Sequence, residues 1–184
     1  GRGIQIDAQG NIYVNGAFQG TVDFDPNAST LTLSSNGATD IFMAKLNNSG
    51  NLVWAKSMGS SSNDNGTDLV LDKKGTNIYL TGQFENTIDF DPNVGTTNLT
   101  SLGSADIYIS KFDTTGNLIW VKHFGGIVYE HVSGIKLDSL ENIYLAGGYG
   151  DIVDFDPNSG IANLTSSGSN DLYISKLDSN GVLM

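Results

Sequence analysis

The sequence contains no cysteine and only three prolines among its 184 residues. Without thiols, neither a disulfide framework nor a thiolate metal site can form, which excludes a small disulfide-stabilised fold. Basic residues are also scarce, with nine lysines and arginines against twenty aspartates and glutamates. The resulting net charge of −11 repels nucleic acids and anionic membrane surfaces, so we expect neither of them as a partner.

Long apolar runs are missing as well. No run approaches the roughly 20 residues that a membrane-spanning helix needs, so we expect no membrane insertion. Helical periodicity is absent, because apolar residues recur at every second position in short runs bounded by glycine, asparagine and aspartate. With 39% hydrophobic residues the chain can build a core, and these patterns predict an all-β fold.

One short segment occurs three times. It reads VDFDPN at 22–27, IDFDPN at 88–93 and VDFDPN at 153–158. The other runs repeat with the same period of 65 or 66 positions, as in NIYVNG, NIYLTG and NIYLAG, or in DIFMAKL, DIYISKF and DLYISKL. A fixed period of this length indicates a repeat protein, in which one unit is copied almost three times.

Each copy is predicted to contain four strands, A to D. In the middle copy these are 68–72, 77–84, 106–112 and 118–124. The corresponding strands elsewhere are A at 3–7 and 134–138, B at 11–18 and 142–149, C at 40–46 and 171–177, and D at 52–58. Short turns with aspartate or asparagine followed by glycine join A to B and C to D, as expected for tight hairpins. The B to C connection is much longer and carries the DFDPN segment.

Four antiparallel strands per copy predict blades of a β-propeller, with a meandering sandwich as the alternative. The blades would be residues 1–58, 59–124 and 125–184, with strand D incomplete in the third and no separate second domain. Three blades are too few to close a ring, so we expect a partial propeller or part of a larger ring. Exposed blade edges would then favour self-association. Up-and-down strand order further predicts that all three DFDPN segments lie on the face formed by the B to C loops.

Three motifs carry a resemblance to a known family. GNLVWAKSMG at 50–59, NIYLTGQF at 77–84 and DIYISKF at 106–112 resemble the SBBP-type β-propeller repeats of secreted and cell-surface bacterial proteins, notably of Bacteroidota, in which long DFDP-containing versions occur. The resemblance implies an extracellular or cell-surface location and a role in binding, adhesion or scaffolding. It supplies no catalytic residue.

The DFDPN segments also contain candidate calcium ligands, because D-x-D-x-N places hard oxygen ligands at positions 1, 3 and 5. The candidates are Asp23, Asp25, Asn27, Asp89, Asp91, Asn93, Asp154, Asp156 and Asn158. The pattern departs from an EF-hand, since position 6 is not glycine and position 12 is not glutamate. In the alternative interpretation, the phenylalanines pack against the blade, and the aspartates accept turn hydrogen bonds or pair with the recurring lysines.

No catalytic constellation is visible in the sequence. His123 and His131 are the only histidines, and neither has a counterpart in another copy. With the nearby Tyr129 and Glu130 they could form a small site, but nothing else in the sequence supports one. We therefore expect a non-catalytic extracellular module for binding or scaffolding, with calcium as a candidate stiffening ion and a protein or glycan partner at the B to C loop face. The alternatives are a carbohydrate-active hydrolase or lyase on the same fold, and a structural subunit that assembles through blade edges.

Overall fold

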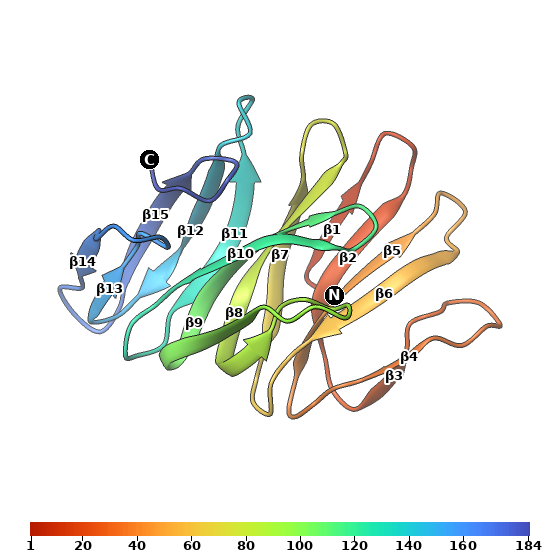
Figure 1. Cartoon of the computed structure of the whole chain (residues 1–184), viewed down its shortest axis with the longest axis horizontal. Helices are drawn as coiled ribbons and strands as arrows, with labels where there is room; N and C mark the ends of the chain where they lie inside the picture. Colours follow the sequence, from red (N-terminus) through yellow and green to blue (C-terminus); the bar gives the residue numbers. More distant parts are fainter.

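The computed structural model describes residues 1–184 and consists of strands and their connections. It contains no helix, and therefore none that could span a membrane. Most strands belong to three antiparallel sheets that follow one another along the chain and stand side by side in an open arrangement (Figure 1). The predicted all-β fold is confirmed.

Each sheet is a simple meander. Sheet 1 contains, in spatial order, β1 (Gly3–Ile6), β2 (Ile12–Phe18), β5 (Asp40–Leu46) and β6 (Leu52–Met58). Sheet 2 contains β7 (Asn65–Leu71), β8 (Asn77–Asp89), β9 (Asn98–Asp113) and β10 (Leu118–Phe124). Sheet 3 contains β11 (His131–Leu137), β12 (Ile143–Tyr149) and β15 (Asp171–Leu177), and an isolated bridge from Leu183 to Leu177 marks a fourth position.

The predicted bounds of β5, β6, β10 and β15 are confirmed. In contrast, β7 and β11 each begin three residues earlier than the predicted strands. Both strands have a shift of register near their start, between Gly66 and Asp68 and between Val132 and Gly134. Such a bulge interrupts the apolar alternation, which explains why the pattern did not reveal the first residues of these strands.

The tight turns are held by an aspartate or asparagine and, in all but one of them, by a left-handed glycine. In sheet 2, Asp113 Oδ1 accepts hydrogen bonds from the amides of Thr115 (2.8 Å) and Asn117 (3.0 Å), and Gly116 has a φ of 83°. Burial raises the pKa of Asp113, but hydrogen bonds from the side chains and amides of Thr115 and Asn117 outweigh it and lower the pKa to about 2. Gly10, Gly50, Gly75 and Gly181 occupy equivalent positions, whereas Glu141 adopts the same conformation in the first turn of sheet 3.

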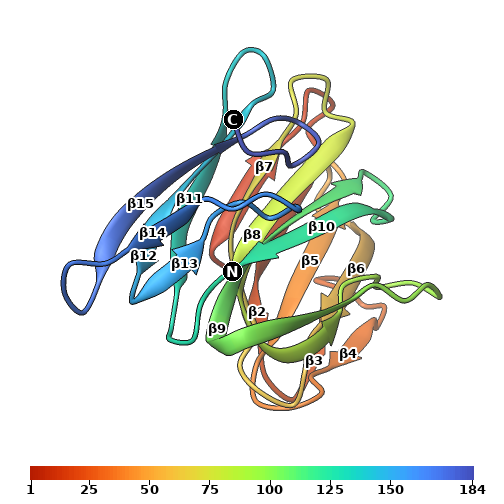
Figure 2. The ribbon, with the colours of Figure 1, turned by 60° about the vertical axis from the view of Figure 1, so that its left-hand side comes forward.

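A second hairpin follows strand B in every copy. It is β3 (Thr21–Asp23) with β4 (Thr32–Ser34) in sheet 1, the end of β8 with the start of β9 in sheet 2, and β13 (Ile152–Asp154) with β14 (Asn163–Thr165) in sheet 3. Figure 2 shows the ends of β8 and β9 curving away from the body of their sheet into this hairpin. A left-handed residue lies before each hairpin, at Gly20, Asn86 and Asp151.

The second hairpins fold back along their sheets. Asn93 and Asn158, at the ends of two DFDPN segments, donate hydrogen bonds to the carbonyl oxygens of Gly116 (3.3 Å) and Gly181 (3.0 Å) in the turns between the third and fourth strand positions. These turns lie at the opposite end of the sheet from the B to C connection. The prediction that DFDPN decorates the B to C loop face is therefore wrong, because the hairpin reverses direction after strand B.

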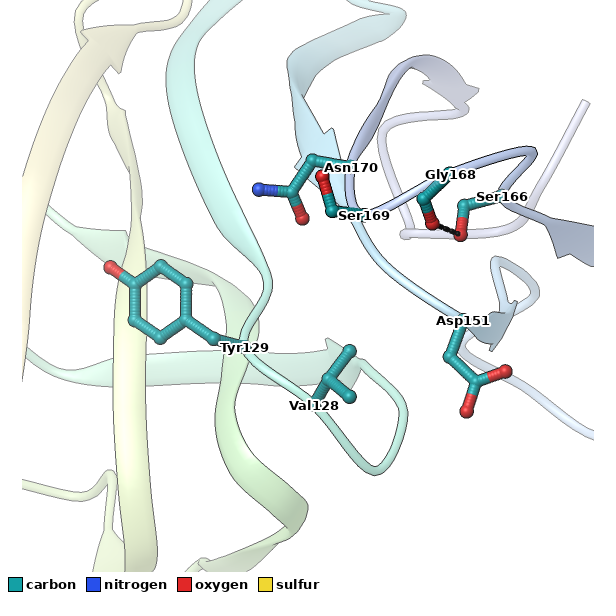
Figure 3. A pocket seen from close by; sticks show the side chains of 7 residues that line it. All are labelled: Val128, Tyr129, Asp151, Ser166, Gly168, Ser169 and Asn170. Carbon is teal, nitrogen blue, oxygen red and sulfur yellow. Dashed lines mark hydrogen bonds between the residues drawn. The ribbon is translucent and has the colours of Figure 1, made fainter.

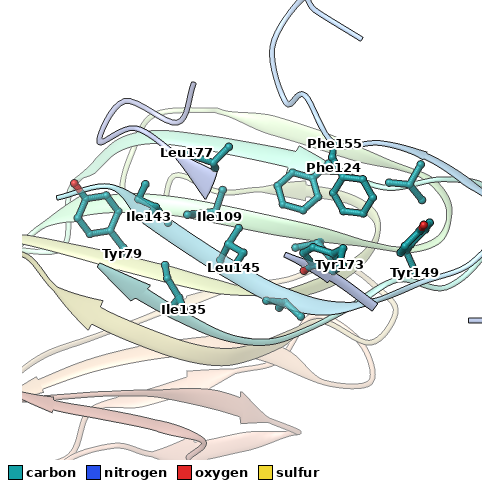
Figure 4. Close-up of a cluster of buried hydrophobic side chains, with 13 residues drawn as sticks. Tyr79, Ile109, Phe124, Ile135, Ile143, Leu145, Tyr149, Phe155, Tyr173 and Leu177 are labelled. Atoms are coloured by element: carbon teal, nitrogen blue, oxygen red, sulfur yellow. The ribbon is translucent and has the colours of Figure 1, made fainter. Parts of the chain in front are cut away.

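Both faces of a sheet carry apolar side chains, which alternate along each strand. We call the face turned toward the next sheet along the chain the forward face, and the opposite one the rear face. One buried cluster joins Tyr13, Ile41 and Met43 on the forward face of sheet 1 to Leu69 and Leu80 on the rear face of sheet 2. A second cluster joins the forward face of sheet 2 to the rear face of sheet 3 in the same way (Figure 4). The core therefore lies between the sheets.

Candidate functional site

The DFDPN segments form three equivalent loops that are closed by their own aspartates. In the middle copy, Asp89 Oδ1 accepts hydrogen bonds from the amides of Asp91 (3.0 Å) and Thr97 (2.8 Å), and Asp91 Oδ1 accepts one from the amide of Asn93 (3.0 Å). The same bonds recur around Asp23 and Asp25 and around Asp154 and Asp156. One oxygen of each aspartate is thus already used within the loop.

The phenylalanine of each segment packs onto its own sheet. The ring centroid of Phe24 lies 5.0 Å from that of Phe42, Phe90 lies 4.9 Å from Tyr108, and Phe155 lies 4.7 Å from Tyr173. Phe90 and Phe155 are buried, whereas Phe24, which faces no preceding sheet, is half-buried. The repeated phenylalanine therefore anchors the second hairpin.

The asparagine of the segment links neighbouring sheets. Lys56 in β6 of sheet 1 donates to Asn93 Oδ1 (2.8 Å), and Lys122 in β10 of sheet 2 donates to Asn158 Oδ1 (2.6 Å). Each DFDPN loop of sheets 2 and 3 is therefore held by a lysine of the preceding sheet. This use of the lysines differs from the predicted pairing with aspartate.

A second series of lysines lies over tyrosine rings. The Nζ atoms of Lys45, Lys111 and Lys176 are 5.0, 5.0 and 5.3 Å from the ring centroids of Tyr13, Tyr79 and Tyr144. Lys45 and Lys111 also donate to the carbonyl oxygens of Thr114 (3.4 Å) and Ser179 (3.3 Å) in a turn of the following sheet. No lysine forms an ion pair within 4.0 Å, so the prediction of lysine–aspartate pairs is wrong. The lysines bridge sheets through uncharged groups.

The nine predicted calcium ligands remain in three separate loops, one on each sheet. The chain contains no group of three or more histidine, aspartate or glutamate side chains placed to hold a metal ion together. The amide hydrogen bonds described above account for the recurring aspartates without an ion. The geometry thus favours the hydrogen-bonding interpretation, and calcium binding stays a hypothesis from the sequence.

A set of buried acids escaped the sequence-based prediction. Asp40, Asp64, Asp106 and Glu130 are fully buried, and each accepts a hydrogen bond from the amide four residues earlier in the chain. Asp40 begins β5 and Asp106 occupies the equivalent position within β9, whereas Asp64 and Glu130 directly precede β7 and β11. The acids recur with the period of the repeat, which was a signal in the sequence for a structural role. In the structure each acid closes a short loop through its amide hydrogen bond.

Burial perturbs the titration of these acids. It raises the pKa of Asp106 to about 6, against the opposing effect of the hydrogen bond from the Leu102 amide. Burial likewise raises the pKa of Glu130 to about 7, and the negative charge of Asp106 adds to the effect. Because both side chains are covered by protein, neither of them reaches a cleft in which it could act on a substrate.

The two histidines contact different partners. His123 Nε2 is 3.6 Å from Asp106 Oδ2, and burial lowers the pKa of the imidazole. His131 stacks against Tyr129, with ring centroids 6.4 Å apart. Of the four residues that the sequence grouped, the structure brings Tyr129 and His131 together and turns Glu130 inward. They do not form a shared acid–base site.

An open cleft of about 450 Å³ lies beside Tyr129 (Figure 3). Val128 and Tyr129, from the loop between sheets 2 and 3, line one side, and the segment from Ser166 to Asn170 lines the other. Asp151, one of the left-handed residues, completes the lining. Five of the seven lining residues are not hydrophobic, and their hydroxyl, amide and carboxylate groups can exchange hydrogen bonds with a ligand.

Comparison with known proteins gives two distant similarities, and no family model matches the chain. The chain is 22% identical over 111 residues to the regulatory protein FlaEY of Caulobacter vibrioides, covering 60% of this chain and 12% of that protein. It is 25% identical over 114 residues to the uncharacterized WD repeat-containing protein L264 of Acanthamoeba polyphaga mimivirus, covering 54% of this chain and 8% of that protein. The chain therefore spans only a small part of either relative.

We expect removal of calcium to leave the protein unchanged. The aspartates of the DFDPN loops are held by backbone amides, so the melting temperature in EDTA should equal that in millimolar calcium, with magnesium as the control for ionic strength. Differential scanning calorimetry measures this. A rise of the melting temperature with calcium alone would establish a metal site in the folded state and contradict the hydrogen-bonding interpretation.

The raised pKa of Glu130 predicts a dependence of stability on pH. Between about pH 4.5 and about pH 7 the folded protein retains a proton that the unfolded chain releases, so the free energy of unfolding should fall as the pH rises through this range. Urea denaturation of the wild type and of Glu130→Gln at several pH values measures the effect. The variant should lose part of the fall, whereas Asp171→Asn, at the equivalent of Asp106 in sheet 3, is the matched control.

His123 titrates in the opposite sense, because its pKa is lowered in the folded protein, but it contributes equally to both proteins in this comparison. An identical pH dependence of the wild type and Glu130→Gln would show that the glutamate is not the source of the effect.

Proposed function

We propose that the chain is a non-catalytic binding or scaffolding module of an extracellular or cell-surface protein, built from consecutive blades of a β-propeller. We further propose that the cleft beside Tyr129 binds a neutral, polyhydroxylated ligand such as a glycan. The observation that carries the ligand proposal is the lining of this cleft, five of whose seven residues are non-hydrophobic.

The propeller interpretation is supported by the way in which the sheets meet. Two four-stranded meanders and a three-stranded one follow one another, and their first strands lie closest together, since β7 contacts β1 and β2 while β11 contacts β7 and β8. Blades of a propeller are arranged around an axis in this manner. The similarity to a protein named for WD repeats, which build propeller blades, points in the same direction.

The ligand proposal is supported by the chemistry of the cleft. The side chains of Ser166, Ser169, Asn170 and Asp151 offer both donors and acceptors to hydroxyl groups. Tyr129 is 52% exposed beside the cleft, and the face of its ring that is not stacked on His131 is of the kind that packs against the apolar face of a sugar ring. The net charge of −11 makes a neutral or basic ligand more favourable than an acidic one.

The proposal of a non-catalytic role is supported by the placement of the titratable groups. The acids with the most perturbed pKa values, Asp106 and Glu130, are buried between sheets, and they close loops. A hydrolase would need two carboxyl groups facing each other across an open cleft, but the cleft beside Tyr129 has one, that of Asp151. The extracellular location is supported by the resemblance of the repeats to SBBP-type repeats.

A glycan array with labelled protein tests the ligand proposal. We expect binding to a subset of neutral glycans, and a loss of about fivefold in affinity for Tyr129→Ala and for Asn170→Ala, since each removes contacts worth about 1 kcal/mol. Val94→Ala, at a fully exposed position away from the cleft, is the control.

Two outcomes would contradict the proposal. Binding that is unaffected by both cleft variants would place the ligand elsewhere, and an array without any binding would leave the cleft without its proposed ligand class. Release of soluble products from a bound polysaccharide would favour the alternative of a hydrolase or lyase.

A further inference from the structure

The forward face of sheet 3 has no covering sheet. Leu172 and Ile174 in β15 are 76% and 72% exposed. Their equivalents in the repeat, Ile41 and Met43 in sheet 1 and Ile107 and Ile109 in sheet 2, are all 0% exposed, because the next sheet packs on them. Apolar residues at these two positions of the third strand are therefore buried in sheets 1 and 2 and exposed to solvent in sheet 3.

The rear face of sheet 1 is open in a complementary way. Ile4 and Ile6 in β1 are each 63% exposed. Their equivalents in the first strands of the other sheets are Leu69 and Leu71 in β7 and Ile135 and Leu137 in β11, of which Leu69 and Ile135 are buried against the preceding sheet. The two ends of the molecule thus expose the two kinds of face that pack against each other between its internal sheets.

A groove marks the place where a first strand would lie on sheet 3. It has a volume of about 350 Å³, runs between β11 and β12, and is lined by Tyr144, Ala146 and Ile174 among others. The two internal interfaces show what occupies the equivalent position. In them β7 lies against β1 and β2, and β11 lies against β7 and β8. The groove therefore has the position and apolar character required by the rear face of a first strand.

We propose that the forward face of sheet 3 binds the rear face of sheet 1 of a second copy of this chain. Ile4 of the second copy would join Tyr144, Leu172 and Ile174 in one apolar cluster, as Leu69 belongs to one buried cluster with their equivalents between sheets 1 and 2. Lys176, which lies over Tyr144, would donate to the carbonyl oxygen of Asn48 of the second copy, as Lys45 and Lys111 donate to Thr114 and Ser179.

The two contacting surfaces are different, so this association is head-to-tail and either closes into a ring or continues as a filament. It uses the faces of the sheets, not the strand edges considered from the sequence. The inference does not depend on ligand binding at the cleft beside Tyr129.

Two substitutions test the proposal separately at each surface. Ile174→Lys places a charge on the forward face of sheet 3, and Ile4→Lys places one on the rear face of sheet 1. Both positions are exposed, so both variants should fold, which circular dichroism can verify. Val94→Lys, at a fully exposed position on the second hairpin of sheet 2, is the matched control. The measurement is the molar mass by light scattering over a dilution series.

We expect the wild type and Val94→Lys to show a mass that exceeds 19.5 kDa and rises with concentration, and each face variant to remain at 19.5 kDa. A mixture of the two face variants should form a complex of twice that mass and no larger one, because each variant retains the surface that its partner needs.

Three results would overturn the proposal. A wild type that stays monomeric at all concentrations shows that a second copy does not occupy this face, which then belongs to another partner. Self-association that survives in Ile4→Lys but is lost in Ile174→Lys indicates contact between two forward faces. A mixture of the face variants that remains monomeric excludes the head-to-tail contact.

Discussion

The structure depends on apolar contact between successive sheets. Each sheet carries apolar side chains on both faces, and a four-stranded sheet of this kind cannot shield them by itself. Sheet 2 has neighbours on both sides, and four consecutive residues of its third strand, 106–109, are all buried. Sheet 1 and sheet 3 each have one neighbour. Their uncovered faces expose the same kinds of residue that the internal interfaces bury.

Polar contacts position the sheets that the apolar contacts hold together. Lysines reach from one sheet to a turn or a DFDPN loop of the next, and buried acids close the loops that precede the strands. These bonds are directional, whereas apolar burial is not. They therefore help to position neighbouring sheets relative to each other, whereas the loops near Tyr129 line a cleft.

Much of this fold could be predicted from the sequence, because the strands follow an alternating apolar pattern and the turns carry aspartate and glycine at fixed positions. The reversal of the second hairpin could not, since it depends on a single left-handed residue, Asn86 or its equivalents, in a long connection. The role of the lysines was also misjudged. Their tyrosine and carbonyl partners are distant in sequence or lie in another copy. The buried acids and the cleft were missed because burial and concavity arise only when the sheets pack.

Two equivalent positions test most directly whether contact between sheets stabilises the fold. Leu69 and Ile4 occupy the same place in the first strand, but Leu69 is 0% exposed against sheet 1 and Ile4 is 63% exposed. If contact between sheets stabilises the fold, Leu69→Ala should lower the free energy of unfolding by about 2 to 5 kcal/mol. Ile4→Ala should then lower it by less than about 1 kcal/mol, measured by urea denaturation at a dilution where the chain is monomeric. Equal losses at the two positions, or a negligible loss at Leu69, would contradict the claim that the core lies between the sheets.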